Sequence, residues 1–215
     1  TLSAPEAQTA AAQGTSVKTN SDGSVVIYGA PGGVASNLAA GAAMVYTRSG
    51  TSWTKQTVLT PNPSQSNMKF GTSVALSNDG LWAAVGAPNY APMGIITGGV
   101  QLFKRITGSW TASADLYTES YGSIQAFGTD VVLNQDGTQV PIGDPSNATS
   151  YGAGFVYSRN GLDWSYVEKI TKTARATNDN FGYSVAMDML GKRYLVGAYK
   201  SAEVATAGGS AYLFQ

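Results

Sequence analysis

Residues 70 to 88 read Phe70-Gly71-Thr72-Ser73-Val74-Ala75-Leu76-Ser77-Asn78-Asp79-Gly80-Leu81-Trp82-Ala83-Ala84-Val85-Gly86-Ala87-Pro88. Residues 73–76 alternate in polarity, which predicts a short strand. The Asp79-Gly80 pair that follows is a strong hairpin signal, because glycine takes positive φ at no steric cost. Residues 82–85 are apolar without alternation, which indicates a second strand buried on both faces. The stretch therefore predicts a β-hairpin that stops at Gly86-Ala87-Pro88.

The same pattern occurs four times along the chain. Its first glycine recurs at spacings of 57, 57 and 54 residues, as Gly14, Gly71, Gly128 and Gly182. Two further glycines follow each anchor after nine and fifteen residues: Gly23, Gly80, Gly137 and Gly191, then Gly29, Gly86, Gly143 and Gly197. We predict one domain, 1–215, with repeats at about 14–70, 71–127, 128–181 and 182–215 plus 1–13.

Each copy has places for four strands. First strands are expected at 16–19, 73–76, 130–133 and 184–187, and second strands at 25–28, 82–85 and 194–196. Pro141 interrupts the second strand of the third copy, and we expect irregularity there because proline lacks a ladder donor. Third strands are expected at 44–47, 100–103, 155–158 and 211–214. A tryptophan, followed six residues later by an aliphatic residue, marks the fourth strand at Trp53/Leu59, Trp110/Leu116 and Trp164/Ile170.

The fourth copy stops at Gln215, before its own tryptophan and fourth strand. Leu2 lies twelve residues before Gly14, as Leu59 lies twelve before Gly71. We therefore expect the N-terminal segment to complete the last copy. Four strands at a period near 55 predict an all-β fold, a β-propeller of four-stranded antiparallel blades.

Composition excludes several classes of function. Charged residues make up 12% of the 215 and cancel to a net charge of zero, which argues against nucleic acid and against a polybasic membrane contact. The chain has no Cys and no His, so thiol nucleophiles, imidazole bases and the common zinc sites are absent. No run of 18 apolar residues is present, so we expect no membrane insertion. The chain begins at Thr1, which we interpret as a processed N-terminus compatible with export.

The motif resembles the FG-GAP repeat of integrin alpha-subunit propellers. Three pairs carry the resemblance: Phe70-Gly71 with Gly86-Ala87-Pro88, Phe127-Gly128 with Gly143-Asp144-Pro145, and Phe181-Gly182 with Gly197-Ala198-Tyr199. The first copy has Gln13-Gly14 with Gly29-Ala30-Pro31. The resemblance implies an extracellular or cell-surface setting and a role in adhesion and protein binding.

Two departures from this family matter. Such propellers usually have seven blades, whereas four copies are present here. Four blades could close alone, two chains could form an eight-bladed ring, or the four could belong to a larger assembly. The Asp-x-Asp-x-Asp-Gly calcium loop that the family often carries is absent, so we expect no cofactor and at most weak calcium binding. Asp22, Asp79 and Asp136 each precede a hairpin glycine and are interpreted as turn residues, as is the segment 177–180.

The loops after each Gly-Ala-Pro stop differ between copies and are the best candidates for binding. They supply Asn89, Tyr90, Tyr151, Tyr199 and Lys200 as candidate ligand-binding residues. Asn147-Ala148-Thr149 is an N-glycosylation acceptor sequence, which makes Asn147 a candidate glycosylation site. The three repeated tryptophans are expected to pack between blades, with a row of sugar-stacking platforms as the alternative.

No catalytic motif is present. The sequence has no Ser-x-x-Lys or Gly-x-Ser-x-Gly elbow, and Glu119, Asp163 and Glu168 are only loose candidates for paired acids. We therefore expect a non-catalytic module that binds a protein partner or assembles with itself. The alternative is a carbohydrate-binding propeller of lectin type, for which similar pockets between successive blades are the expected sign.

Overall fold

The fold was described from a computed structural model, which defines residues 11–33, 39–118, 126–146, 151–173, 178–202 and 208–215. These residues form fifteen strands joined by turns and contain no helix. The described part of the chain therefore offers no helix long and apolar enough to cross a membrane. Three sheets have four strands and the last has three. The all-β fold predicted from the repeats is confirmed.

Each repeat forms one antiparallel sheet, called a blade here, with its strands in sequence order. Blade 1 consists of β1 (Val17–Thr19), β2 (Val25–Ala30), β3 (Ala42–Ser49) and β4 (Ser52–Leu59). Blade 2 consists of β5 (Ser73–Leu76), β6 (Trp82–Ala87), β7 (Gly99–Ile106) and β8 (Ser109–Leu116). Blade 3 consists of β9 (Asp130–Val131), β10 (Gln139–Asp144), β11 (Ala153–Asn160) and β12 (Asp163–Ile170). Blade 4 consists of β13 (Phe181–Met187), β14 (Tyr194–Ala198) and β15 (Ser210–Phe214).

Pro141 has the local effect that the sequence predicts. It lies within β10 and pairs in regular register with Val156 of β11. On the other side, β9 has only two residues and its ladder with β10 ends at Val131–Ile142. The next ladder position belongs to Pro141, whose nitrogen carries no hydrogen to donate. The first strand of blade 3 is therefore shorter than its counterparts.

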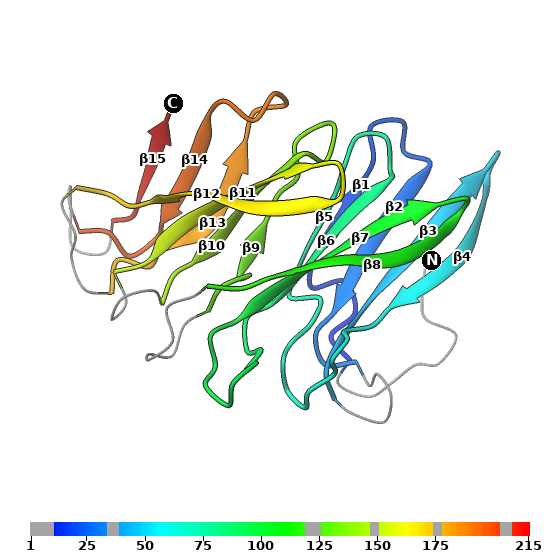
Figure 1. The fold of residues 1–215 in the computed structure, drawn as a ribbon, viewed down its shortest axis with the longest axis horizontal. Coiled ribbons are helices and arrows are strands. Elements are labelled where there is room, and N and C mark those ends of the chain that lie inside the picture. The colour runs from blue at the N-terminus through cyan, green and yellow to red at the C-terminus, as the bar shows by residue number, and fades with distance from the viewer. Residues whose placement is uncertain (1–10, 34–38, 119–125, 147–150, 174–177, 203–207) are drawn as a thin grey trace.

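The blades stack face to face, and the core lies between them (Figure 1). One cluster, which includes Ile27, Val45 and Val85, joins blades 1 and 2. Equivalent clusters join blade 2 to blade 3 and blade 3 to blade 4. Because each sheet covers its neighbour, central blades bury both faces.

The Phe-Gly pairs insert at each junction between blades. The side chains of Phe70, Phe127 and Phe181 are 1%, 0% and 0% exposed. Each phenylalanine forms a backbone bridge to a glycine of the preceding blade, as Gly41–Phe70, Gly98–Phe127 and Gly152–Phe181. The repeated Phe-Gly motif thus connects each blade to the one before it.

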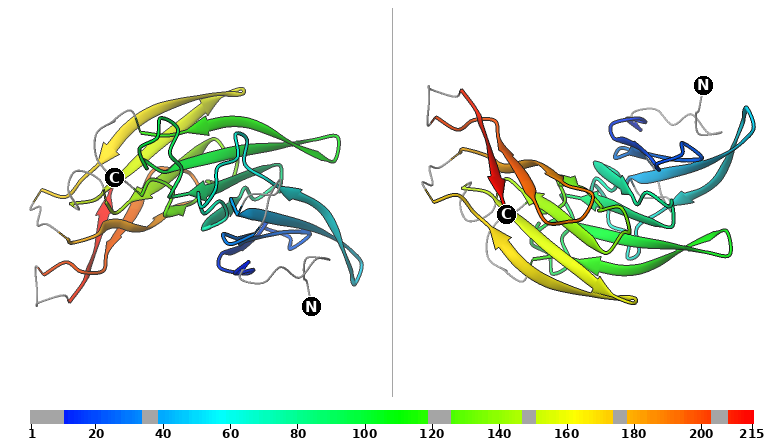
Figure 2. Two further views of the ribbon diagram at one scale, coloured as in Figure 1. Left: turned by 90° about the horizontal axis from the view of Figure 1, so that it is seen from below. Right: turned by 90° about the horizontal axis from the view of Figure 1, so that it is seen from above.

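Together the blades form an arc. Blade 1 and blade 4 lie at its opposite ends, with blades 2 and 3 between them (Figures 1 and 2). The expected completion of blade 4 by the N-terminal segment involves Leu2, which lies outside the described residues, and stays a prediction. Among the described residues, β15 is the last strand of its sheet.

Candidate binding groove and the predicted loop residues

A groove of about 440 Å³ lies where the outer strands of blades 2 and 3 meet. Its lining comes from the end of β8 and from β11 and β12. The lining residues are Asp115, Leu116, Tyr117, Thr118, Phe155, Tyr157, Trp164, Tyr166 and Lys169. The volume falls in the range of ligand-binding sites, and the lining is mainly aromatic.

The aromatic side chains of the groove are held in place by one another. The Tyr157 ring meets the Tyr166 ring edge-on, with their centroids 5.8 Å apart. The Tyr157 hydroxyl donates a hydrogen bond of 3.2 Å to the backbone oxygen of Tyr117. Tyr157 itself is buried, whereas Tyr166 is 55% and Tyr117 40% exposed. The groove therefore presents two exposed tyrosines on a fixed base.

Charges of both signs line the groove. The Asp115 carboxylate accepts a hydrogen bond of 2.6 Å from the Gln101 side-chain amide. The Lys169 ammonium lies 5.3 Å from the centre of the Phe155 ring, within cation–π range. Asp115 is the one carboxylate among the described lining residues. Glycoside hydrolysis requires two.

The loose acid candidates do not supply a second carboxylate. Asp163 and Glu168 lie on β12 but are not among the residues that line the groove. Glu119 lies outside the described residues. The groove thus has the features of a binding surface rather than of a two-carboxylate site.

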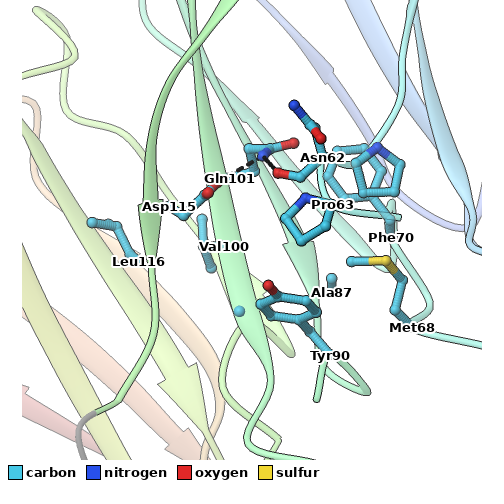
Figure 3. A pocket seen from close by; sticks show the side chains of 12 residues that line it. Asn62, Pro63, Met68, Phe70, Ala87, Tyr90, Val100, Gln101, Asp115 and Leu116 are labelled. Atoms are coloured by element: carbon cyan, nitrogen blue, oxygen red, sulfur yellow. Dashed lines mark hydrogen bonds between the residues drawn. The ribbon is translucent and has the colours of Figure 1, made fainter. Parts of the chain in front are cut away.

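A second pocket contains Tyr90, one of the predicted binding residues (Figure 3). It lies between blade 2 and the segment 61–63, and the Gln101 amide donates 2.9 Å to the Asn62 backbone oxygen. Its volume is only about 20 Å³, room for about one water. Burial, followed by the charge of Asp115, raises the pKa of Tyr90. Tyr90 and its neighbour Asn89 are half-buried, and Tyr90 packs against the core.

The remaining predicted loop residues lie apart from the groove. Tyr199 is 48% exposed and follows β14, where its ring lies 4.5 Å from that of Tyr183. The Lys200 ammonium lies 5.3 Å from the Tyr199 ring centre. Tyr151 is half-buried, just before β11. The glycosylation candidate Asn147 lies outside the described residues.

The aspartates before the hairpin glycines act mainly in the turns. Asp22 accepts a hydrogen bond of 2.8 Å from the Ser24 backbone N–H, and Asp79 accepts one of 2.9 Å from that of Leu81. Hydrogen bonds from Ser24 lower the pKa of Asp22. The predicted turn role is confirmed for these two residues.

Asp179, in the oxygen-rich segment before β13, has a different partner. Its carboxylate forms a buried ion pair with Lys172, with side-chain exposures of 3% and 4%. The Lys172 ammonium also donates to the hydroxyls of Ser201 (3.4 Å) and Tyr212 (3.3 Å). Within the described ranges, no three acidic, His or Cys side chains are grouped as a metal site.

The repeated tryptophans pack as expected in two copies. The Trp110 indole donates 3.0 Å to the Gln56 side chain of the preceding blade. Trp164 meets Trp82 of the preceding blade edge-on at 5.9 Å. Trp53, in the first blade, packs against a cluster of its own sheet.

The sequence prediction missed Tyr117, Tyr166 and Lys169. The predicted binding residues lie in loops, whereas the groove is built mainly from strand residues. A signal was available: two residues after the repeated tryptophan the chain has Lys55, Ala112 and then Tyr166. An aromatic residue that appears in only one copy at a repeated strand position marks a local departure from the common blade.

Comparison with known proteins agrees with the described geometry. The family model of the FG-GAP repeat matches residues 53–103 and 164–214. Among solved structures, the RRP9 WD40 repeats share 13% identity and a TM-score of 0.55, over 86% of this chain and 45% of that one. A protein of the 6-phosphogluconolactonase type from Bacteroides uniformis shares 12% identity and a TM-score of 0.55, over 91% and 52%. TolB from Acinetobacter baumannii shares 10% identity and a TM-score of 0.50, over 92% and 40%.

The chain therefore spans about half the length of these propeller-type structures or less, and at this identity the likeness concerns the fold alone. No curated protein matches the chain in sequence. The spacing of the glycines, the inserted Phe-Gly pairs and the family match all point to the same repeat. Residues 53–103 and 164–214 match the FG-GAP repeat, and the repeats of the chain form blades of the β-propeller type.

Proposed function

We propose that the chain is a non-catalytic interaction module of the cell surface or extracellular space, which binds protein partners or assembles with further copies of itself. The surface setting rests on the resemblance to integrin-type propellers. The binding role is supported by the groove between blades 2 and 3, where Tyr117 and Tyr166 are exposed on a packed aromatic base. Tyrosine on a rigid support offers contact area at a low entropic cost.

The difference between successive junctions favours a protein partner. The pocket between blade 2 and the segment 61–63 has about 20 Å³, and the groove between blades 2 and 3 has about 440 Å³. A groove of about 460 Å³ lies between residues 171–173 and β15, but it has no carboxylate among its described lining residues. Lectin propellers would be expected to repeat similar pockets. The groove between blades 2 and 3, with one aspartate and one lysine beside its tyrosines, instead suits a peptide segment or loop that carries an aromatic or aliphatic anchor and charged flanks.

A glycan is the second candidate ligand. The exposed ring of Tyr166 and the nearby Asp115 carboxylate combine a stacking surface with a hydrogen-bond acceptor. A glycan partner would use these two groups in the groove between blades 2 and 3.

Selection of a displayed peptide library on the immobilised chain tests the protein-binding role. We expect enriched peptides that bind the native chain and lose at least tenfold in affinity to Tyr166→Ala, since loss of one exposed anchor removes more than about 1.4 kcal/mol. Leu162→Ala is the matched control, because Leu162 is similarly exposed (53%) but lies at the turn between β11 and β12, outside the groove.

A glycan array probed with the same three proteins separates the two candidates. The protein-binding role of the groove would be contradicted if no peptide is enriched, or if the enriched peptides bind the native chain and both variants equally. Array signals that depend on Tyr166, without enriched peptides, would replace it with the glycan role.

A further inference from the structure

A side chain at one repeat position is hydrogen-bonded to the backbone of the next blade at each of three junctions. At the first two, a serine of the preceding blade donates to the carbonyl oxygen of the next Phe-Gly glycine: Ser16 to Gly71 (3.0 Å) and Ser73 to Gly128 (2.8 Å). At the third, Asp130 takes the place of this serine and accepts 2.8 Å from the Val185 N–H. At each junction the region of the first strand of one blade is therefore hydrogen-bonded to that of the next.

The hairpin turns add a directional series of hydrogen bonds. The Ser21 N–H donates to the Asn78 oxygen (3.1 Å), the Asn78 N–H to the Gln135 oxygen (2.9 Å), and the Gln135 N–H to the Met189 oxygen (3.2 Å). These four residues occupy the same repeat position. The next donor in the series is the N–H of Met189, and the next acceptor at the other end is the oxygen of Ser21.

Blade 4 exposes the face that blades 1 to 3 bury. Leu213 is 61% exposed, whereas Val45, Leu102 and Val156 at the same repeat position are each 0% exposed. Leu195, its neighbour across the ladder, is 44% exposed. Ala186 pairs with Leu195 and extends the same face on β13. We call Ala186, Leu195 and Leu213 the open face of blade 4.

Blade 4 has space beside Gly209 where the equivalent glycines of the other blades contact the Phe-Gly pair of the next blade. A Cβ built on Gly41, Gly98 or Gly152 would overlap the phenylalanine carbonyl oxygen of the next blade. Gly209, at the same position, keeps the positive φ of these glycines (+74°), but the nearest atom to its Cβ is the Tyr199 oxygen at 3.1 Å. Gly197 likewise meets only its own Ser184, not a following blade.

Blade 1 exposes the complementary side. Val17 is 65% exposed, whereas Val74, Val131 and Val185 at the same position are 2%, 0% and 6% exposed. Gly14 has the positive φ of the other Phe-Gly glycines (+83°), yet a Cβ on it would meet nothing within 4 Å. We call Gly14 and Val17 the open face of blade 1.

The two open faces cannot meet within the arc, because blades 1 and 4 lie at its opposite ends (Figure 2). The four blades also match about half of larger propeller-type structures, as consecutive blades of a wider ring would. A second copy of the chain has a blade 1 that could cover the open face of blade 4 and a blade 4 that could cover the open face of blade 1.

We propose that two copies of this chain close an eight-bladed ring, in which blade 1 of each copy packs on the open face of blade 4 of the other. The proposal rests on the self-association included in the proposed function. Two equivalent contacts related by a two-fold axis leave neither open face unpaired, so association stops at two copies. Leu195 and Leu213 of one copy would cover Val17 of the other, as Val45 and Ile27 contribute to the cluster that contains Val74.

The mass in solution tests this ring. The chain has a mass of 22.2 kDa, so two copies give 2 × 22.2 = 44.4 kDa by light scattering or sedimentation. We expect the native chain to be a dimer at about 100 µM, a concentration at which even weak specific contacts associate. Leu195→Glu and Val17→Glu should each give monomers, because each places a charge in the buried contact. Leu162→Glu is the control and should stay dimeric.

Mixing the two monomeric variants gives the sharpest result. In a mixed pair, the intact blade 4 of the Val17→Glu chain can still pack on the intact blade 1 of the Leu195→Glu chain, so part of the dimer should return. Several results would overturn the ring: a monomeric native chain, a Val17→Glu variant that stays dimeric, or polymers longer than two copies. These variants leave the groove between blades 2 and 3 unchanged, so loss of the dimer and loss of peptide binding can be told apart.

Discussion

At the scale of single residues, a difference between two copies of the repeat explains why one buried indole N–H has no hydrogen-bond acceptor. The Trp110 indole has an acceptor in Gln56, but the Trp164 indole N–H is buried without a partner in the described structure. Ser113 occupies the position in blade 2 that Gln56 occupies in blade 1. Its side chain is too short to provide the same acceptor. One substitution between repeats thus leaves a donor unsatisfied.

Ser113→Gln should satisfy that donor. We expect the free energy of unfolding to rise by about 1 kcal/mol, the net value of one hydrogen bond. Ser113→Leu has a similar volume but no acceptor and serves as the control in denaturant titration. Equal effects of the two substitutions would show that packing, rather than the hydrogen bond, is responsible.

Asp130 is a second position at which one copy differs from the others, and its contribution to the stability of the fold depends on pH. Burial raises its pKa, although the N–H groups of Val185 and Val131 oppose the shift. A folded-state pKa above the unfolded value means that the fold holds this proton more tightly. Its contribution to stability is therefore greatest below the unfolded pKa of about 3.9 and decreases as the pH rises through the raised value.

Asp130→Ser restores the residue of blades 1, 2 and 4 and removes this titration. We expect the stability of the variant relative to the native chain to increase from about pH 4 upwards and to level off above the raised pKa. Unfolding curves at a series of pH values measure the difference. A difference that does not change with pH would contradict the raised pKa.

At the scale of elements, the packing of blades depends on glycines that the next blade approaches closely. A Cβ on Gly86 would overlap both the Gly128 carbonyl oxygen and the Ser73 hydroxyl. Neither Gly86 nor Gly197 requires positive φ, and only Gly86 has a following blade in the described structure. Substitutions at Gly86 and Gly197 therefore distinguish the effect of the contact with the next blade from the effect of a side chain within the strand.

Gly86→Ala should destabilise the fold by about 3 kcal/mol, because the two sheets must move apart. Gly197→Ala should change stability by less than about 1 kcal/mol, since the Ser184 side chain can rotate away. Thermal or denaturant unfolding in the monomeric Val17→Glu background makes the comparison independent of association. Equal losses would mean that the approach of the next blade is not the reason for the glycine.

The junction between blades 3 and 4 also contains the Lys172–Asp179 pair, which is buried on both sides. Asp179→Asn removes the buried carboxylate that neutralises the Lys172 charge and should cost about 3–5 kcal/mol. The double variant Lys172→Met/Asp179→Leu should cost clearly less, because it removes both charges. Chemical denaturation of the two variants measures the difference, and an equal loss would contradict a charge effect.

Strands and their order were predictable because they follow a repeat with fixed positions. The predicted 73–76 is the strand β5, and Pro141 shortens β9 as its missing donor requires. The groove was not predictable to the same degree. Tyr166 and Tyr117 acquire their role from the meeting of two blades, and a strand pattern shows which residues alternate but not what the next sheet leaves uncovered.

At the scale of the whole molecule, four consecutive blades form an arc with two complementary open faces. The repeat count alone left a four-bladed ring, a pair of chains and a larger assembly as alternatives. The arc places blades 1 and 4 far apart, and the exposures of Val17 and Leu213 identify the blade faces that have no neighbouring blade among the described residues. The count of copies could be made from the sequence, whereas the curvature of the arc depends on how each pair of sheets packs.

In the assembly that we propose, two arcs complete one ring. End-on electron-microscopy images of the native chain test it most directly. We expect closed rings with eight spokes and two-fold symmetry. Open arcs of four spokes, or closed rings of four, would contradict it.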